Sequence, residues 1–202
     1  MTTSPGPTQL VGSAIATLSG SRWAIVDAGT NVPSKPGLYA IYGDEQAWAD
    51  LGLPVEADRP LYIGKAEDSL VSRDLNGHFA AIPGSVARTG SSTVRRSFAA
   101  LLREQLRLRA VPRNRSKPER FANYGLADGG DDRLTEWMHQ RLMLAVWPAP
   151  SGMSPTLDAV ETAVIHHFVP PMNLAKNPGK LVTLSRARAS MTAEAASWAP
   201  AT

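Results

Sequence analysis

Two short segments of alternating hydrophobic character lie close together in the first third of the chain. Residues 37–42 read Gly-Leu-Tyr-Ala-Ile-Tyr, and residues 60–65 read Pro-Leu-Tyr-Ile-Gly-Lys. Both are rich in aromatic and β-branched residues and both are bounded by proline and glycine, which is typical of strands. In the first segment Tyr39 and Ile41 point to one face, and the residues between and beside them to the other. The pattern predicts two neighbouring strands, joined over residues 44–59 by a helical turn or excursion.

The periodicity of the remaining sequence predicts four helices and a third strand. The helices cover residues 68–77, about 93–109, 134–140 and 156–168, and the strand covers residues 142–147. Asp68 or Ser69 is placed to cap the first of these helices, and Gly77 to end it. Pro148 stops the strand.

These elements predict an α/β (α+β) domain with a small, mainly antiparallel three-stranded sheet flanked by helices. We expect the domain to cover residues 23–180. Residues 1–22 form an N-terminal tail that is partly disordered, in which the pattern does not decide between helix and strand over residues 10–18. Residues 23–26 fit either a short strand or an apolar flap. Residues 181–202 form a C-terminal extension, with room for a helix near residues 191–198.

The composition fits a single cytoplasmic domain. A chain of 202 residues with 43% hydrophobic residues is enough for one packed core. No apolar run is long enough to span a membrane, and the N-terminus has no basic segment followed by an apolar one. The absence of cysteine excludes disulfides, thiol catalysis and cysteine-ligated zinc.

Positive charge is concentrated in one segment. Between Arg88 and Arg120 lie ten of the 21 Lys and Arg residues and only two acidic residues. Such segregation is expected of a protein that binds a polyanion. On the predicted helix Arg96, Arg103 and Arg107 fall opposite the apolar arc. They and Arg95 are our candidates for binding nucleic acid, and the alternative is a charged helix face that is merely solvated.

One carboxylate lies on an apolar face. In the helix over residues 156–168, Glu161 shares its arc with Val160, Val164 and Ile165. A carboxylate that faces a core is costly unless it is paired, hydrogen-bonded or bound to a metal. Both a metal ligand and an edge glutamate paired with an arginine satisfy this requirement.

The two predicted strands carry motifs that resemble those of the GIY-YIG nuclease family. Gly37-Leu38-Tyr39 matches the first motif, with leucine in place of isoleucine, and Tyr62-Ile63-Gly64 matches the second. The family then has an arginine, a glutamate and an asparagine in that order, and Arg73, Glu161 and Asn173 fill these places. A histidine is expected four residues after the arginine, whereas His78 comes five residues after it.

The resemblance implies a divalent-metal-dependent endonuclease that hydrolyses phosphodiester bonds in DNA. Glu161 would bind Mg²⁺ (or Mn²⁺), because this ion commonly takes one carboxylate together with waters and phosphate oxygens. Tyr39 would be the general base, Tyr62 would orient water or phosphate, and Arg73 would clamp the phosphate. The remaining roles are assistance by His78 or Lys65 and hydrogen bonding by Asn173.

Two other functions fit the same sequence. One is a catalytically silent nucleic-acid-binding module on the same fold, which the shifted position of His78 favours. The other is a protein whose basic face meets an acidic protein partner. If the chain is a nuclease, one site of this kind cuts one strand, so we expect nicking or a homodimer that forms transiently on DNA.

Overall fold

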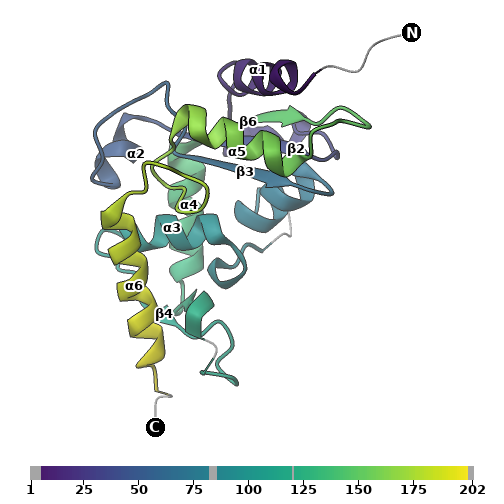
Figure 1. Cartoon of the computed structure of the whole chain (residues 1–202). Helices are drawn as coiled ribbons and strands as arrows, with labels where there is room; N and C mark the ends of the chain where they lie inside the picture. Colours follow the sequence, from purple (N-terminus) through teal and green to yellow (C-terminus); the bar gives the residue numbers. More distant parts are fainter. Residues whose placement is uncertain (1–5, 82–85, 120, 200–202) are drawn as a thin grey trace.

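A four-stranded antiparallel sheet forms the centre of the molecule (Figure 1). The computed structural model describes residues 6–81, 86–119 and 121–199. The strands are β1 (Trp23–Ala24), β2 (Gly37–Gly43), β3 (Tyr62–Ala66) and β6 (Leu142–Pro148), in the spatial order β1-β6-β2-β3. The predicted α+β class and its three strands are confirmed. The predicted strand count is too low by one, because β1 is only two residues long and its sequence carries no alternation.

Each face of the sheet is covered by helices (Figure 1). Leu38, Ala40 and Tyr42 of β2 pack in a cluster with α1 (Pro7–Leu18) and α5 (Leu157–Phe168). Tyr39 and Ile41 point the other way, into the larger cluster. That cluster is completed by η2 (Val71–His78), α3 (Thr93–Leu101), α4 (Gly130–Arg141) and α6 (Val182–Ala196). The predicted alternation along β2 thus directs successive side chains into two different hydrophobic clusters, one on each face of the sheet.

The two predicted ends of the chain both contain packed helices. In α1, Leu10, Ala14 and Leu18 are buried at helical spacing. Residues 10–18, for which the sequence pattern did not decide between helix and strand, are therefore helical. In α6, Leu184 and Met191 are buried in the main core. The helix within the predicted C-terminal extension, residues 182–196, therefore packs on the same core as the predicted domain. Residues 1–5 of the predicted tail lie outside the described residues.

The elements between the main strands and helices are short. They are η1 (Ile25–Thr30), α2 (Glu45–Asp50), η3 (Thr89–Ser91), η4 (Phe121–Asn123), and a second small sheet of β4 (Ala110–Val111) and β5 (Gly125–Leu126). The helix predicted over residues 93–109 ends at Leu101, and the chain continues in turns to Arg107, whose φ is +49°. None of the described helices is long and apolar enough to cross a membrane.

Candidate active site

A cleft of about 520 Å³ opens at the outer edge of β3. Six of the predicted catalytic residues line it, namely Tyr39, Tyr62, Lys65, Arg73, His78 and Glu161. Because β3 is an edge strand, side chains from both faces of the sheet reach this cleft around its outer side. The tyrosines belong to the face that packs on η2 and α3, whereas Glu161 comes from α5 on the opposite face.

The register of β2 and β3 brings the two tyrosines together. Tyr39 is opposite Gly64 and Ile41 is opposite Tyr62, so all four residues share one face. The Tyr39 and Tyr62 rings stack with centroids 6.1 Å apart. A Cβ atom on Gly64 would lie 2.4 Å from both Cζ and Oη of Tyr39. The glycine is therefore required because the Tyr39 ring crosses the backbone of β3.

A π-helical turn places Arg73 and His78 on the same side of η2. The Phe79 N–H donates to the Asp74 carbonyl at 3.0 Å, five residues back, and the whole element Val71–His78 is π-helical. In such a helix residues five apart lie one turn apart. The spacing of five between Arg73 and His78 thus brings both side chains to the cleft. The prediction that Gly77 ends the helix is wrong by one residue, because His78 is still helical.

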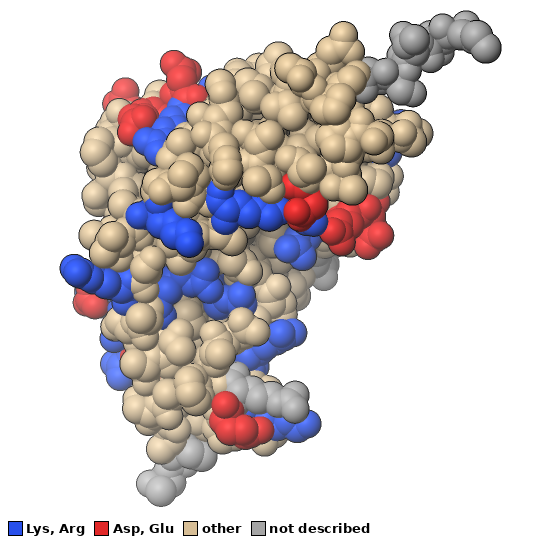
Figure 2. Space-filling model, in the orientation of Figure 1, with Lys and Arg blue, Asp and Glu red and all other residues tan. Residues whose placement is uncertain are grey.

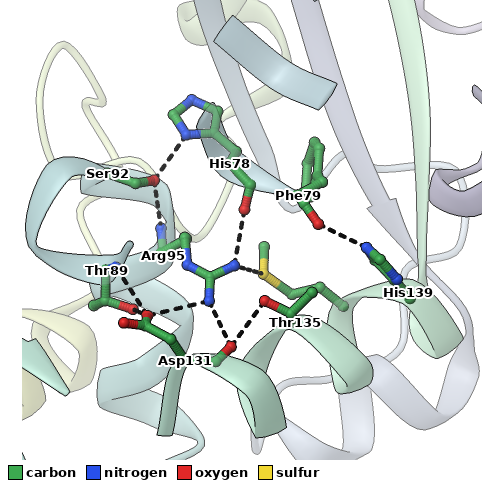
Figure 3. Close-up of polar contacts among 9 residues, drawn as sticks. His78, Phe79, Thr89, Ser92, Arg95, Asp131, Thr135 and His139 are labelled. Atoms are coloured by element: carbon green, nitrogen blue, oxygen red, sulfur yellow. Dashed lines mark hydrogen bonds and ion pairs between the residues drawn. The ribbon is translucent and has the colours of Figure 1, made fainter. Parts of the chain in front are cut away.

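His78 connects Tyr39 to the start of α3, and Figure 3 shows its contact with Ser92. Its Nε2 lies 3.0 Å from Tyr39 Oη, and its Nδ1 lies 2.8 Å from Ser92 Oγ. Ser92 Oγ also accepts the Arg95 N–H at 3.1 Å as the N-cap of α3. A neutral imidazole donates through one ring nitrogen and accepts through the other, so His78 donates to one of these two hydroxyl oxygens and accepts from the other.

Burial keeps these groups uncharged. It lowers the His78 pKa to about 3, helped by the charges of Arg73 and Arg95. It also raises the Tyr39 pKa well above its usual value of 10.0, and the Tyr62 pKa to about 12. The Arg73 charge opposes the rise of both tyrosine pKa values. At neutral pH the protein alone thus holds a neutral histidine hydrogen-bonded to a neutral phenol.

Glu161 is paired with a lysine. Its side chain is almost fully buried, and its Oε2 accepts from Lys176 Nζ at 2.6 Å. Lys176 Nζ also donates to Asp158 Oδ1 at 2.6 Å, and Asp158 in turn accepts from Lys65 Nζ at 2.7 Å. The sequence left an ion pair with arginine open for Glu161, and the structure shows an ion pair with a lysine that sequence reasoning did not single out.

The donor set fits a hard cation held by one protein carboxylate. Among the described residues, no three His, Cys, Asp or Glu side chains come together as a metal site. Glu161 faces the cleft beside two phenol oxygens, with open space for water and phosphate. This arrangement suits Mg²⁺ or Mn²⁺, which keep several waters and complete their shell with substrate oxygens.

The comparison with protein families identifies this arrangement. The model of the GIY-YIG catalytic domain matches residues 55–190. The chain belongs to the GIY-YIG family. This match confirms the resemblance inferred from the motifs. The GIY-YIG catalytic domain is a nuclease domain. The match begins after β2, and Tyr39 takes its place in the site through the pairing of β2 with β3. Comparisons with curated proteins and with solved structures found no match.

In this GIY-YIG domain Asn173 supports the cleft from outside it. The Ile63 N–H donates to Asn173 Oδ1 at 2.9 Å, and Asn173 Nδ2 donates to the Ile63 carbonyl at 2.8 Å. The amide thereby takes the place of a neighbouring strand along the free edge of β3. Met172 N–H adds a bond to the Leu61 carbonyl at 2.9 Å. Asn173 thus fixes the strand that carries Tyr62 and Gly64.

The predicted basic stripe on α3 is not an exposed surface. Arg95 is fully buried, where it donates to the His78 carbonyl at 2.9 Å and pairs with Asp131 at 3.2 Å (Figure 3). Arg96 is also buried, and it donates to the Gly90 carbonyl. Arg103 pairs with Glu194 of α6. The prediction of an open face is wrong for Arg95 and Arg96, which are buried. Arg103 is half-buried beside α6, and Arg107 is exposed as predicted.

A second carboxyl group lies behind the cleft. Asp74 is fully buried, and neither of its carboxyl oxygens has a hydrogen-bond partner among the described residues. Burial raises its pKa well above the usual value, against the effect of the neighbouring Arg73 charge. Burial thus favours the protonated form of the Asp74 carboxyl group. Neither Asp74 nor Ser92 was singled out in the sequence, since a single aspartate or serine carries no distinctive pattern.

The close approach of Tyr39 to Gly64 can be tested with G64A. The added methyl group would overlap the Tyr39 ring, so the ring must move and its bond to His78 must break. We expect a loss of about 1–3 kcal/mol in the free energy of unfolding, the usual cost of overpacking, measured by urea denaturation. The control is G12A, where an added methyl group meets nothing within 4 Å. A G64A protein as stable as the G12A protein would contradict this geometry.

The burial of neutral His78 predicts a pH dependence of stability. Between its unfolded pKa of 6.5 and its folded pKa of about 3, the unfolded chain binds a proton at this side chain and the folded protein does not. As pH falls below 6.5, the wild type should therefore lose up to about 1.4 kcal/mol per pH unit more than H78Q. Urea denaturation at pH 7, 6 and 5 measures the difference. H166Q at an exposed position is the histidine control, and parallel wild-type and H78Q curves would refute the burial of a neutral imidazole.

Proposed function

We propose that this GIY-YIG protein is a divalent-metal-dependent endonuclease that hydrolyses phosphodiester bonds in DNA. The observation that carries the proposal is the convergence of Tyr39, Tyr62, Arg73, His78 and Glu161 in one cleft. They come from β2, β3, η2 and α5, and ordinary core packing does not require a phenol pair, a guanidinium and a carboxylate to share one opening. One cleft holds one scissile phosphate. We therefore expect nicking, or a homodimer that forms transiently on DNA.

Each of these residues has a separate role in hydrolysis. Arg73 is exposed at the cleft and binds two oxygens of the scissile phosphate through its planar guanidinium. Tyr39 acts as the general base, and its hydrogen bond with His78 Nε2 holds the phenol oxygen in position. Tyr62, stacked beside Tyr39, orients the attacking water. Glu161 would hold the divalent cation, which would supply charge stabilisation at the phosphate and oppose the rise of the Tyr39 pKa that burial causes.

An adjoining groove offers a path for the nucleic acid. A second cavity of about 510 Å³ shares Ser91 with the cleft and is lined by Arg88, Arg113 and Arg115. The Arg113 side chain lies against Gly90, where a Cβ atom would come within 2.7 Å of it. On the face seen in Figure 2, Lys and Arg side chains form a discontinuous band across the middle of the molecule. Arg88, Arg113 and Arg115, in place of the buried Arg95 and Arg96, are the candidates for contact with the phosphate backbone.

A catalytically silent nucleic-acid-binding module is the second candidate. The raised pKa values of Tyr39 and Tyr62 and the ion pair of Glu161 with Lys176 favour it. In the protein alone, the base is protonated and the metal ligand is engaged. The two functions differ in one measurement, which is cleavage of plasmid and of structured DNA with Mg²⁺ or Mn²⁺ and with chelator.

Replacing Glu161 by glutamine should separate binding from cleavage. E161Q keeps the shape of the side chain and its ability to accept from Lys176, but it lacks the charge that holds the cation. We expect a folded protein that still binds DNA and whose cleavage rate falls at least about a thousandfold, since a metal ion supplies several kcal/mol at the transition state. The control is E67Q, which removes an exposed carboxylate from the same cleft. An E161Q protein that cleaves like E67Q would refute the proposed role.

The groove beside the cleft can be tested through the salt dependence of DNA binding. If Arg88 and Arg113 each neutralise one phosphate, R88Q and R113Q should each reduce the slope of log affinity against log salt by about 0.9. The control is R22Q, because Arg22 lies over the Tyr42 ring on the opposite face of the sheet. Fluorescence anisotropy with a labelled duplex at several salt concentrations gives the slopes. Equal slopes for all four proteins would exclude the groove as a phosphate contact.

A further inference from the structure

A chain of alternating charges runs along the rim of the cleft. Lys65 Nζ lies 2.7 Å from both Glu67 and Asp158, and Lys176 Nζ lies 2.6 Å from both Asp158 and Glu161. The two lysines thus share the exposed carboxylate of Asp158, and only Lys176 reaches the buried carboxylate of Glu161. The side chain of Glu161 is 11% exposed and that of Asp158 is 55% exposed. The carboxylate that most needs a counter-ion is therefore the one that Lys176 holds.

The backbone at Lys176 is held in place by the same loop that supports β3. Its φ of +60° lies in the left-handed region, which a lysine seldom adopts. Asn177, the next residue, is buried and donates to the carbonyls of Pro170 and Asn173. Asn173 in turn is bonded to Ile63. Lys176 is thus fixed relative to the strand that carries Tyr62, and its contact with Glu161 is set by the fold of the loop.

An ammonium group and a divalent cation compete for the same carboxylate. When a cation binds Glu161, the Lys176 charge must move away or face strong repulsion in a largely buried site. Asp158 lies three residues earlier on α5 and already accepts from Lys176 Nζ. The lysine therefore keeps a partner after it leaves Glu161, without a change of backbone.

We propose that Lys176 is the resident counter-ion of the metal site, displaced from Glu161 onto Asp158 when the divalent cation binds. The proposal rests on the proposed function, because it takes Glu161 as the metal ligand. It adds that the affinity for metal is set by an exchange between two cations. Without metal, Lys176 pairs with Glu161 in place of the divalent cation, and this pairing keeps the metal affinity low.

The first test is a calorimetric titration of the full chain with Mn²⁺, without nucleic acid. K176M should bind Mn²⁺ about tenfold more tightly than the wild type, the low end of what one hydrogen bond to a charged group contributes. K176R, which keeps the charge, should stay close to the wild type. K180M is the matched control, since Lys180 is an exposed lysine four residues further along the chain. Unchanged or weaker binding by K176M, or equal tightening by K180M, would overturn the proposal.

The second test asks whether Asp158 acts through Lys176. D158N removes the carboxylate that receives the displaced lysine, so it should weaken Mn²⁺ binding several-fold in the wild-type background. In the K176M background it should have almost no effect, because no lysine has to be received. If D158N weakens binding equally in both backgrounds, Asp158 acts only as a nearby charge and the exchange is refuted.

The third test uses stability in chelator and does not require metal binding or cleavage. K176M should melt at a lower temperature than the wild type, because Glu161 loses its counter-ion. E161Q/K176M should recover part of that loss, since no buried charge is left unpaired. A K176M protein that melts like the wild type would contradict the role of Lys176. Because none of these measurements uses DNA, a protein that passes all three but cleaves no nucleic acid would refute the proposed nuclease and leave this inference standing.

Discussion

The cleft depends on the contact between the Tyr39 ring and the backbone of Gly64. The two residues are opposite each other on paired strands, and the ring can cross β3 only because Gly64 has no side chain. Crossing the strand carries the phenol oxygen from the middle of the sheet toward its outer edge. There it meets His78 from one face, and Glu161 from α5 on the other face lines the same cleft. An edge strand is usually a liability, and here its free side is the place where the two layers of the domain can both contribute to one cleft.

The charges behind the cleft are arranged very differently from those on its rim. Arg95 is buried with almost every donor satisfied, by His78, Asp131 and the Met138 sulfur. Such a network adds little net stability, but it restricts the backbone to one arrangement. It ties the end of η2 to the starts of α3 and α4, and so fixes the imidazole of His78. Among the described residues Asp74 has no such network, and burial raises its pKa, which favours the protonated form.

The sequence predicted the parts of this molecule that depend on local pattern. Alternation along β2 and the position of Glu161 on an apolar arc follow from periods of two and about 3.6 residues, and both are seen in the structure. The π-helical turn could not be predicted, because the sequence of η2 fits an ordinary helix ended by Gly77. The burial of Arg95 and Arg96 depends on α4 and α6, which are distant in the sequence. For the same reason Lys176 looked like one more loop lysine, although the fold brings it to Glu161.

The C-terminal helix α6 supports the cleft without contributing a side chain to it. It packs against α3, and the N-cap of α3 is Ser92, whose hydroxyl oxygen lies 2.8 Å from His78 Nδ1. No residue of α6 lines the cleft, so a chain cut before Val182 would retain every side chain that lines it. It would nevertheless lose the support beneath the helix that orients the histidine. A minimal version of this domain must therefore include α6, because α6 packs against the helix that holds His78 in place.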